Sequence, residues 1–242
     1  MTLNSYTRSA AFYDLIYEFR DVHALNEELI RYLQAHAPAA TSLLDVACGT
    51  GQQLAALTTY DRVGVDLSPE ILTVAAERVP DIPLLAQDMV ELDVGRTFGA
   101  IICLSSSISY VRTIERLNRA VASMAAHLEP GGALLVEPWF TPEQFWDGHL
   151  SVRHAADEHV NLTWMYRQER HDRLSVLPIH YLVAAAAGVE HWVETHEMGL
   201  FTDAEYASAL RAAGLEIHDD PGPLAGRAMY VAHKRPDPDG PR

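Results

Sequence analysis

The sequence predicts an α/β protein built on a doubly wound, mostly parallel sheet. Apolar, strand-like runs recur along the chain, helix-length amphipathic segments separate most of them, and a glycine loop follows the first run directly. Chains that alternate strands and helices in this way pair their strands in parallel and place helices on both faces. The runs end at Val46, Val65, Leu85, Leu104 and Val136.

Two segments between these runs are predicted to be crossover helices. Residues 68–79 begin with Ser68, a favourable N-cap residue, and carry Glu70 in their first turn. Residues 113–128 are predicted to be helical up to a breaker formed by Pro130 and the two glycines that follow it.

Further elements are predicted on either side of these runs. Residues 10–19 and 22–36 have helical periodicity, and we expect these N-terminal helices to lie over the strand ends as a lid. Near the other end, residues 202–214 read as a capped helix that ends at a glycine. A short strand follows, and residues 226–234 contain the last strand, which we expect to be antiparallel at the far side of the sheet.

An insertion is predicted between the fifth strand and this C-terminal helix. Residues 151–200 alternate polar and apolar side chains, a pattern that indicates three or four antiparallel strands. We therefore divide the chain into a main domain of residues 1–150 and 201–235, the insertion, and a disordered tail of residues 236–242. The insertion is expected to cover the substrate or to form a dimer interface.

Composition excludes several classes of function. The 242 residues include 18 basic and 33 acidic side chains, and the net charge of -15 argues against nucleic acid as a partner. No apolar run is long enough to span a membrane and the first residues lack the plan of a signal peptide, so we expect a cytoplasmic location. Cys48 and Cys103 lie in strand-like segments and are expected to be buried free thiols.

The glycine loop indicates that a ligand lies against the backbone after the first strand. Gly49 and Gly51 follow this strand, and ligands of open α/β sheets bind at the carboxyl ends of the strands. A dinucleotide fingerprint needs a third glycine where the chain has Leu54, and the Gly-Lys-Ser/Thr of a phosphate-binding P-loop is absent. Neither a dinucleotide nor a nucleoside triphosphate is therefore favoured.

Acidic residues lie within or directly after the first three strands. Asp45 is on the first strand, Asp66 ends the second and Asp88 ends the third. The carboxylate of Asp66 is suited to accept hydrogen bonds from two ribose hydroxyls, and Asp88 with Met89 is placed to read the amino edge of an adenine. This pattern predicts an adenosine pocket without phosphates, whose acidic rim is compatible with a cofactor that carries positive charge on sulfur.

The segments LLDVACGTG, GVDLS, AQDM and HLEPGGALLVE resemble those of class I S-adenosylmethionine-dependent methyltransferases. The resemblance implies a seven-stranded, Rossmann-like methyltransferase sheet with N-terminal helices and an inserted antiparallel sheet. It also implies that S-adenosyl-L-methionine is the cofactor and that the main domain binds it. The implied cofactor-binding residues are Tyr17, Arg20, Asp45, Ala47, Gly49, Gly51, Asp66, Leu67, Asp88, Met89, Leu104 and Ser105.

A closer resemblance covers nearly the whole chain. The segments FYDLIYEFRD, LSSSISYV, VEPWFTPEQF, IHYLVA, GLFTDAEYASALRAAGL and GPLAGRAMYV are similar, in the same order, to those of nucleotide-sugar N,N-dimethyltransferases. These enzymes act on 3-amino-3,6-dideoxyhexoses of the desosamine and mycaminose type in antibiotic biosynthesis. The implied substrate is a thymidine-diphosphate (dTDP) aminosugar, and the implied assembly is a homodimer built partly through the insertion.

This closer resemblance also implies roles at the acceptor side. Tyr110 matches a residue near the reacting amine, Tyr6 a tyrosine that closes on the site, and Arg227 an arginine that holds the phosphates or the sugar. The remaining implied substrate-binding residues are Tyr13, Glu137, Trp139, His180 and Tyr181. We predict no metal site, because the histidines lack supporting acidic ligands at metal-binding spacing.

Two departures from the relatives leave the acceptor open. Tyr6 lies one residue nearer to the YDL segment, and Trp139 is followed by Phe140 where the relatives have a second tryptophan. The stereochemistry of the sugar, the position of its amine and the number of methyl transfers are therefore not fixed. One alternative is an O- or N-methyltransferase acting on a natural-product core, and a more distant one is a catalytically silent adenosyl-binding module.

Overall fold

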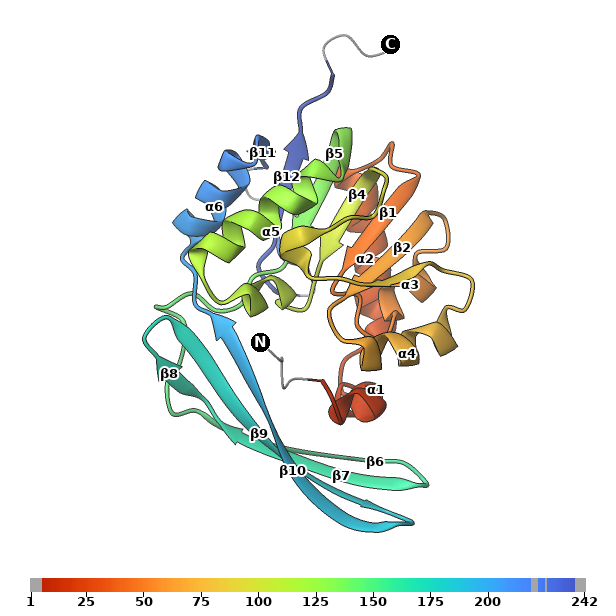
Figure 1. Ribbon diagram of the computed structural model, residues 1–242, viewed down its shortest axis with the longest axis vertical. Coiled ribbons are helices and arrows are strands. Elements are labelled where there is room, and N and C mark those ends of the chain that lie inside the picture. Colours follow the sequence, from red (N-terminus) through yellow and green to blue (C-terminus); the bar gives the residue numbers. More distant parts are fainter. Residues whose placement is uncertain (1–5, 219–221, 225, 238–242) are drawn as a thin grey trace.

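A computed structural model describes residues 6–218, 222–224 and 226–237. Within these residues the chain forms two sheets, one mostly parallel and covered by helices and one antiparallel, and the two lie at different ends of the molecule (Figure 1). Most of the predicted tail, residues 238–242, lies outside the described residues.

The larger sheet has seven strands in the order β3-β2-β1-β4-β5-β12-β11. Its first five strands are parallel, whereas β12 is antiparallel to β5 and to β11, so the predicted class of fold is confirmed. The antiparallel last strand is second from the edge, because β11 pairs on its outer side. The strands are β1 (Ser42–Val46), β2 (Asp61–Asp66), β3 (Leu84–Ala86), β4 (Phe98–Cys103), β5 (Leu128–Val136), β11 (Leu215–Ile217) and β12 (Tyr230–Lys234).

Helices cover both faces of this sheet, which is why every residue of β1 and β4 is buried. On one face, Leu29 and Leu33 of α2 (Val22–His36) pack in one core cluster with Leu43. On the other face, Leu117 of α5 (Ile114–Ala126) packs in a second cluster with Leu44. The remaining helices of the main domain are α3 (Gln52–Ala56), α4 (Pro69–Arg78), α6 (Asp203–Ala212) and the 3-10 turns η2 (Met89–Glu91) and η3 (Ser107–Val111).

Side-chain caps fix the start of two predicted helices. The hydroxyl of Ser68 accepts a hydrogen bond from the Ile71 backbone N–H at 3.3 Å, at the start of α4. At α6, Thr202 and Glu205 form a reciprocal capping box. These caps lie at the predicted first residues, so the predicted starts of both helices are confirmed. Each such cap stabilises a helix by about 1 kcal/mol.

The N-terminal segment is less helical than its periodicity predicts. Instead of one helix over residues 10–19, it forms the 3-10 helix η1 (Ser9–Phe12) and the single turn α1 (Tyr13–Ile16). The backbone N–H of Ser9 is bound by the carboxylate of Glu194, a residue far along the chain. A tertiary contact thus holds the start of this segment.

The predicted helix breaker lies inside a strand. Pro130 and the glycines after it belong to β5, which begins two residues after α5 ends. Gly131 has φ +81°, and the pairing register with β4 shifts between Phe98 and Ala100. The breaker therefore forms a β-bulge near the start of the strand, where one strand carries more residues than its partner.

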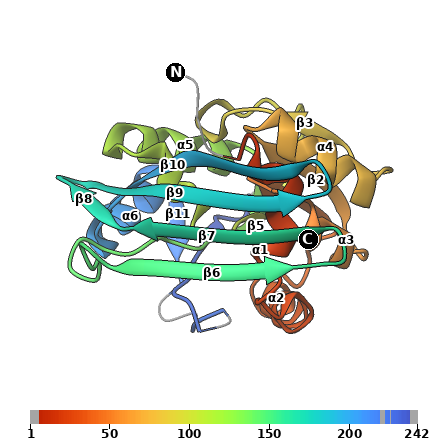
Figure 2. The same ribbon diagram turned by 90° about the horizontal axis from the view of Figure 1, so that it is seen from below.

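The second sheet contains β6 (Leu150–Ala156), β7 (Val160–Arg167), β9 (Leu174–Ala185) and β10 (Gly188–Gly199), in the order β10-β9-β7-β6, and the short β8 (Glu169–His171) pairs with β9. Figure 2 shows this antiparallel sheet spread across one end of the molecule. On its inner face Trp164, Tyr181 and Trp192 form a buried cluster with Ile16, and Phe12 packs against it. The N-terminal segment therefore lies between the two sheets.

Both cysteines are free and buried, as predicted, Cys48 in the glycine loop and Cys103 at the end of β4. No helix within the described ranges has the length and the apolar character needed to cross a membrane.

Candidate active site

A cavity of about 1220 Å³ lies at the carboxyl ends of the parallel strands. Val46, Asp66, Asp88 and Ser105, which lie at or within two residues of the carboxyl ends of β1, β2, β3 and β4, contribute to its wall. The N-terminal segment and residues 171–174 of the insertion line other parts of it. The cavity therefore occupies the position where open α/β sheets bind their ligands.

The two glycines of the loop have different roles. Gly49 (φ +56°) lines the cavity, and its backbone N–H donates to Asp66 Oδ2 at 3.0 Å. Gly51 (φ +75°) does not line it; a Cβ there would lie 3.2 Å from Cγ2 of Val79, so this glycine allows close packing against the segment that follows α4. Ala47 also has a positive φ, +61°, and lines the cavity beside Gly49.

Asp45 is a buried carboxyl group without a full set of partners. It is 2% exposed, and its Oδ2 has no hydrogen-bond partner among the described residues. Burial and, to a smaller extent, the nearby Asp66 raise its pKa from 3.8 to about 8. It lies in a small side cavity of about 50 Å³ that Leu104 also lines. A cationic ligand group would satisfy this carboxylate.

Asp66 is already oriented by the backbone. Its two oxygens accept hydrogen bonds from the N–H groups of Gly49 and Ser68, each at 3.0 Å. Burial raises its pKa, and these backbone donors partly offset that rise. Each carboxylate oxygen retains a free lone pair, so the fixed side chain can still accept bonds from two hydroxyls. Leu67, 44% exposed, lines the cavity next to it.

Asp88 reaches the cavity together with Met89, but it is not free. Its Oδ2 forms an ion pair with Arg116 at 2.6 Å, and its Oδ1 accepts from the Val90 N–H at 3.1 Å. The side chain is thus held in place, and the sequence pattern gave no sign of its arginine partner.

The N-terminal segment carries a cation to the cavity. The Arg20 guanidinium lies 4.3 Å from the centre of the Tyr17 ring, and within the described residues it forms no ion pair. Tyr13 packs against Tyr17 with ring centres 4.7 Å apart, and all three residues line the cavity. Arg20 is therefore available to bind a ligand carboxylate.

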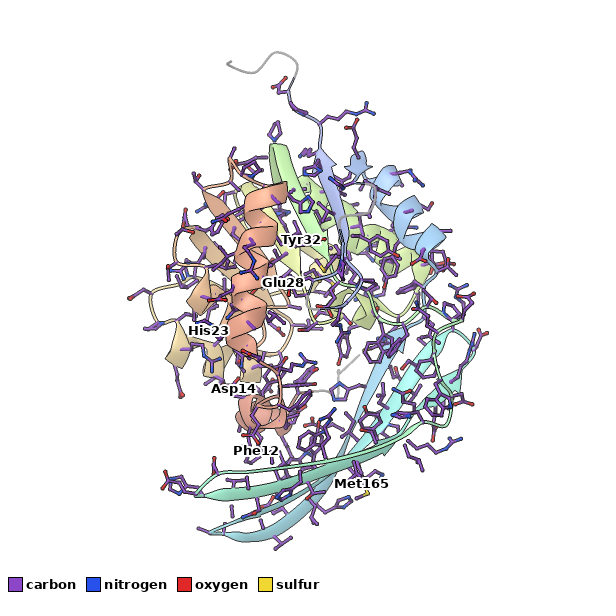
Figure 3. The ribbon with its side chains drawn as sticks, turned by 180° about the vertical axis from the view of Figure 1, so that it is seen from behind. Phe12, Asp14, His23, Glu28, Tyr32 and Met165 are labelled. Carbon is purple, nitrogen blue, oxygen red and sulfur yellow. The ribbon has the colours of Figure 1, made fainter. Side chains whose placement is uncertain are left out.

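Asp14 fastens this segment to the glycine loop. It accepts hydrogen bonds from the Thr50 hydroxyl at 2.9 Å and from the Gln52 amide at 2.7 Å, and it pairs with Arg78. Figure 3 shows Asp14 on the side of the segment facing the main domain, whereas Phe12 points toward the antiparallel sheet. The segment is thus anchored on both sides of the cavity.

Two tyrosines and a histidine meet at the other side of the cavity. The hydroxyl oxygens of Tyr110 and Tyr6 are 3.2 Å apart, and the Tyr110 oxygen lies 2.6 Å from Nδ1 of His196. The Tyr6 ring packs edge-on against His196, with ring centres 4.8 Å apart. Burial raises the pKa of both tyrosines well above 10, so both remain neutral phenols at neutral pH.

His196 belongs to the site although its sequence context did not reveal this. It is 4% exposed, and burial lowers its pKa to about 4. The only signal in the sequence is the alternation of β10, which places His196 on the same buried face as Trp192 and Glu194.

Arg227 and Glu137 support the wall of the cavity from behind. Arg227 forms an ion pair with Glu137 and donates to the Ser106 hydroxyl at 2.8 Å, and Glu137 accepts from the Ser105 N–H at 2.8 Å. Ser105 and Ser106 have φ of +53° and +60°, which is unusual for residues other than glycine. Arg227, Glu137 and the nearby Trp139 do not themselves line the cavity.

The two insertion residues expected to face the sugar lie elsewhere. His180 is exposed on the outer face of β9, where its Nδ1 lies 3.2 Å from Nε2 of His191. Tyr181 is 3% exposed and stacks on Trp192 with ring centres 5.5 Å apart. Adjacent strand residues point to opposite faces, so at most one of the pair can face the inside.

Three arginines not expected from the sequence line the cavity. They are Arg112, directly after η3, Arg116 in α5 and Arg173 in the β8–β9 connection. Each is paired with an acid, Glu197, Asp88 or Glu205 respectively. The protein as a whole is acidic, but these arginines place positive charge beside the cavity, where a ligand anion could replace their carboxylate partners.

Within the described ranges, no group of three or more His, Cys, Asp and Glu side chains is arranged to hold a metal ion. The order of the seven strands, the glycine loop and the acids at the strand ends define a Rossmann-like methyltransferase fold.

Comparisons with known proteins agree with this class. Residues 43–132 match the family described as "Methyltransferase domain". The chain is 39% identical over 227 residues to a dTDP-3-amino-3,4,6-trideoxy-alpha-D-glucopyranose N,N-dimethyltransferase of Streptomyces venezuelae, covering 92% of this chain and 96% of that protein. It is 35% identical to a dTDP-4-amino-2,3,4,6-tetradeoxy-D-glucose N,N-dimethyltransferase of Saccharopolyspora spinosa, covering 92% and 91%.

A solved structure shows the same fold. It is that of CalS10, described as an amino pentose methyltransferase from Micromonospora echinaspora involved in calicheamicin biosynthesis, with S-adenosylmethionine bound. It matches with a TM-score of 0.82 and 34% identity over 92% of this chain and 96% of that one. The chain therefore belongs to the class I S-adenosylmethionine-dependent methyltransferases, in the group that contains these sugar N-methyltransferases. It is an enzyme that uses S-adenosylmethionine as its cofactor.

Proposed function

We propose that this enzyme transfers methyl groups to the amino group of a dTDP-linked aminodeoxysugar and makes the N,N-dimethyl product. The observation that carries the proposal is one cavity lined both by most of the predicted cofactor residues and by the Tyr6–Tyr110 pair. Its volume of about 1220 Å³ exceeds the roughly 300–1,000 Å³ of common single-ligand pockets, so it has room for a cofactor and an acceptor together.

The residues at the strand ends fit the cofactor. When bound, S-adenosylmethionine supplies a methyl group on a positively charged sulfur. Asp66 and Leu67 would hold its ribose, Asp88 and Met89 its adenine, and Arg20 its carboxylate. The buried, unpartnered Oδ2 of Asp45 is suited to the positive charge of the methionine part, because a cation stabilises an ionised carboxylate that burial otherwise disfavours.

Positioning of the amine outweighs base catalysis in this site. A sugar amine with a pKa of about 8 is already about 10% neutral at pH 7, so complete deprotonation costs only about 1.4 kcal/mol. Holding the reacting atoms roughly 3–3.5 Å apart in the correct orientation supplies about 7–11 kcal/mol. Tyr110 and Tyr6 are neutral, partly buried and in contact, and this suits them to orient the amine rather than to remove its proton.

The diphosphate requires positive charge beyond the tyrosines. Arg227 remains the proposed phosphate-binding residue; its side chain is 41% exposed and paired with Glu137, so a phosphate would bind by exchanging for that carboxylate. Arg112 and Arg173 line the cavity itself and offer the same exchange from the insertion side. Recognition of the nucleotide is therefore assigned to arginines rather than to the net charge of the protein.

We further propose that the enzyme is a homodimer that forms through the outer face of the antiparallel sheet. Val152, Met165, Leu182 and Val193 lie on this face of four adjacent strands and are 66%, 50%, 49% and 39% exposed. Figure 3 shows Met165 pointing away from the main domain. An exposed apolar patch that spans four strands can pack against the same patch of a second copy about a twofold axis, which suits a second copy of this chain. A cytoplasmic location stays a prediction from the sequence.

One experiment tests the acceptor and the number of methyl groups. The protein is incubated with methyl-labelled S-adenosylmethionine and a panel of dTDP sugars that carry a 3-amino, a 4-amino or only hydroxyl groups, and the products are weighed by mass spectrometry. We expect two added methyl groups on one aminosugar and none on the hydroxysugars.

The same panel includes each free aminosugar without its nucleotide. Equal turnover of the free sugar would remove the role of the diphosphate and favour an acceptor of another class. Cofactor binding by calorimetry without transfer to any amine would indicate an adenosyl-binding module that lacks chemistry.

A further inference from the structure

We propose that His196 is a positioning residue that accepts a hydrogen bond from the Tyr110 hydroxyl. Because this bond uses the only proton of a hydroxyl that stays neutral, Tyr110 can act only as a hydrogen-bond acceptor toward the amine. This inference rests on the proposed transfer to an amine. The contact that carries it joins Tyr110 Oη and His196 Nδ1 over 2.6 Å.

The direction of this hydrogen bond follows from the chemistry of the two groups. A phenol is a better donor than an imidazole N–H, and an imidazole nitrogen is a better acceptor than a phenol oxygen. Burial also lowers the pKa of His196 to about 4, so the ring is neutral at pH 7 and keeps one nitrogen free to accept. The single Tyr110 proton has two possible acceptors, the Tyr6 oxygen at 3.2 Å and Nδ1 of His196 at 2.6 Å, and the shorter contact is to the stronger acceptor. We therefore assign the proton to the bond with Nδ1, and Nε2 carries the ring proton.

The surroundings hold His196 in this arrangement. The ring is 4% exposed, the Tyr6 ring packs edge-on against it, and the Tyr6 hydroxyl lies 3.2 Å from that of Tyr110. Nε2 of His196 has no partner among the described residues. The strand therefore places a buried imidazole with one unbonded nitrogen at this point, which costs free energy. An apolar side chain would pack here without that cost, so packing alone does not explain a histidine.

The consequence concerns the lone pair of the acceptor nitrogen. The amine attacks through this lone pair, so a hydroxyl that donated a hydrogen bond to it would hold the nucleophile in an unreactive state. Once the Tyr110 proton points to His196, the Tyr110 oxygen can only accept an N–H from the amine. This contact turns the nitrogen so that its lone pair is directed away from Tyr110 and is free to react.

Two variants separate this role from packing. His196→Asn keeps an acceptor oxygen at the position of Nδ1, whereas His196→Leu fills the site without one. For the leucine variant we expect kcat to fall by roughly ten- to a hundredfold, the loss typical of a small misorientation, with little change in KM for the sugar nucleotide. The asparagine variant should keep most of the activity.

The Tyr110→Phe background provides the matched control. If His196 acts through the Tyr110 hydroxyl, His196→Leu has no further effect on kcat once that hydroxyl is absent. An equal loss in both backgrounds would show that His196 only packs against the site, and this result overturns the inference.

A spectroscopic measurement needs neither substrate nor cofactor. In protein labelled with 15N-histidine, the His196 signals are assigned by their absence from the asparagine variant, and long-range 1H–15N correlation identifies the protonated nitrogen. We expect the proton on Nε2, whereas a proton on Nδ1 overturns the inference even if a leucine variant fails to fold. Because this readout does not depend on turnover, inactivity toward every amine would contradict the proposed function and not the hydrogen bond.

Discussion

The carboxylate of Glu194 on β10 binds the backbone of Ser9, 185 positions earlier in the chain, with Oε1 3.1 Å from the Ser9 nitrogen. The same oxygen accepts from the Arg8 N–H at 2.7 Å, and the Ser9 hydroxyl bonds to Oε2. Glu194 and Ser9 are 3% and 1% exposed. The insertion thus holds the chain two residues beyond Tyr6 and fixes where this tyrosine meets Tyr110.

Replacing Glu194 should detach the N-terminal segment from the insertion. Glu194→Ala leaves the buried Ser9 N–H without its acceptor, at a cost of roughly 1–3 kcal/mol if the segment stays in place, and it also removes the acceptor of the partly buried Arg8 N–H. Since the segment can move into water instead, we expect local opening, seen as faster hydrogen exchange of residues 8–16 and a lower kcat.

The matched control for this variant lies on the same strand. Glu190 pairs with the Arg8 side chain, but both side chains are more than half exposed, so Glu190→Ala should change exchange and turnover very little. Equal effects of the two variants would contradict the role given to Glu194.

Asp45 should make the stability of the ligand-free enzyme depend on pH. Its pKa is raised from 3.8 to about 8 in the folded protein, first by burial and then by Asp66. The folded state therefore binds this proton more tightly than the unfolded state, and the stability it contributes is present at low pH and is lost as pH rises toward 8. Asp45→Asn, which resembles the protonated acid, should match the wild type near pH 4 and be more stable near pH 8.

Cofactor binding should reverse the preference of the folded enzyme for a protonated Asp45. The cationic cofactor favours the ionised carboxylate, so part of a proton is released from Asp45 on binding at pH 7. Calorimetry in buffers of different ionisation enthalpy measures this release, and the difference between the wild type and Asp45→Asn removes the contribution of the cofactor's own amine. Identical proton release in the two proteins would show that Asp45 does not face the cation.

Arg227 should affect the acceptor more than the cofactor. With the guanidinium removed in Arg227→Ala, we expect KM for the sugar nucleotide to rise roughly tenfold or more, the loss of one charge-assisted contact of about 1.5–3 kcal/mol. Glu137→Gln separates the second role, because it weakens the support of Ser105 while it leaves the arginine present. A rise in KM for S-adenosylmethionine alone in Arg227→Ala would assign Arg227 to the support of Ser105 and not to the phosphates.

The cofactor half of the site could be read from the sequence because its residues are local to the strand ends. Asp66, Asp88 and Gly49 follow or end strands whose apolar runs are evident, and parallel pairing brings those ends to one edge. Gly51 shares the motif but serves helix packing, a contact with Val79 that spacing alone cannot show.

The acceptor half could be read only in part, since long-range contacts build it. His196 and Glu194 reach the site through the path of the insertion, which no local pattern specifies. Residues 10–19 also depart from their local pattern, because they form η1 and the single turn α1 in place of one helix. Tertiary contacts decided these positions, and intrinsic propensity did not.

The outer face of the antiparallel sheet should decide the oligomeric state. Met165 lies in a row with Val152, His180 and Val193 across the four strands, so it is near the middle of the exposed apolar face. Burying a lysine without a partner in a dimer interface is costly, and Met165→Lys should therefore give a monomer in light scattering where the wild type gives a dimer.

A second lysine variant controls for the added charge. Ala122→Lys places the same charge on the exposed side of α5, far from this sheet along the chain, and should leave the mass in solution unchanged. The cavity is lined by residues of one chain, so monomeric Met165→Lys should retain cofactor binding. If the wild type is monomeric at micromolar concentration, there is no such dimer. If Met165→Lys leaves a dimer intact, the interface lies elsewhere.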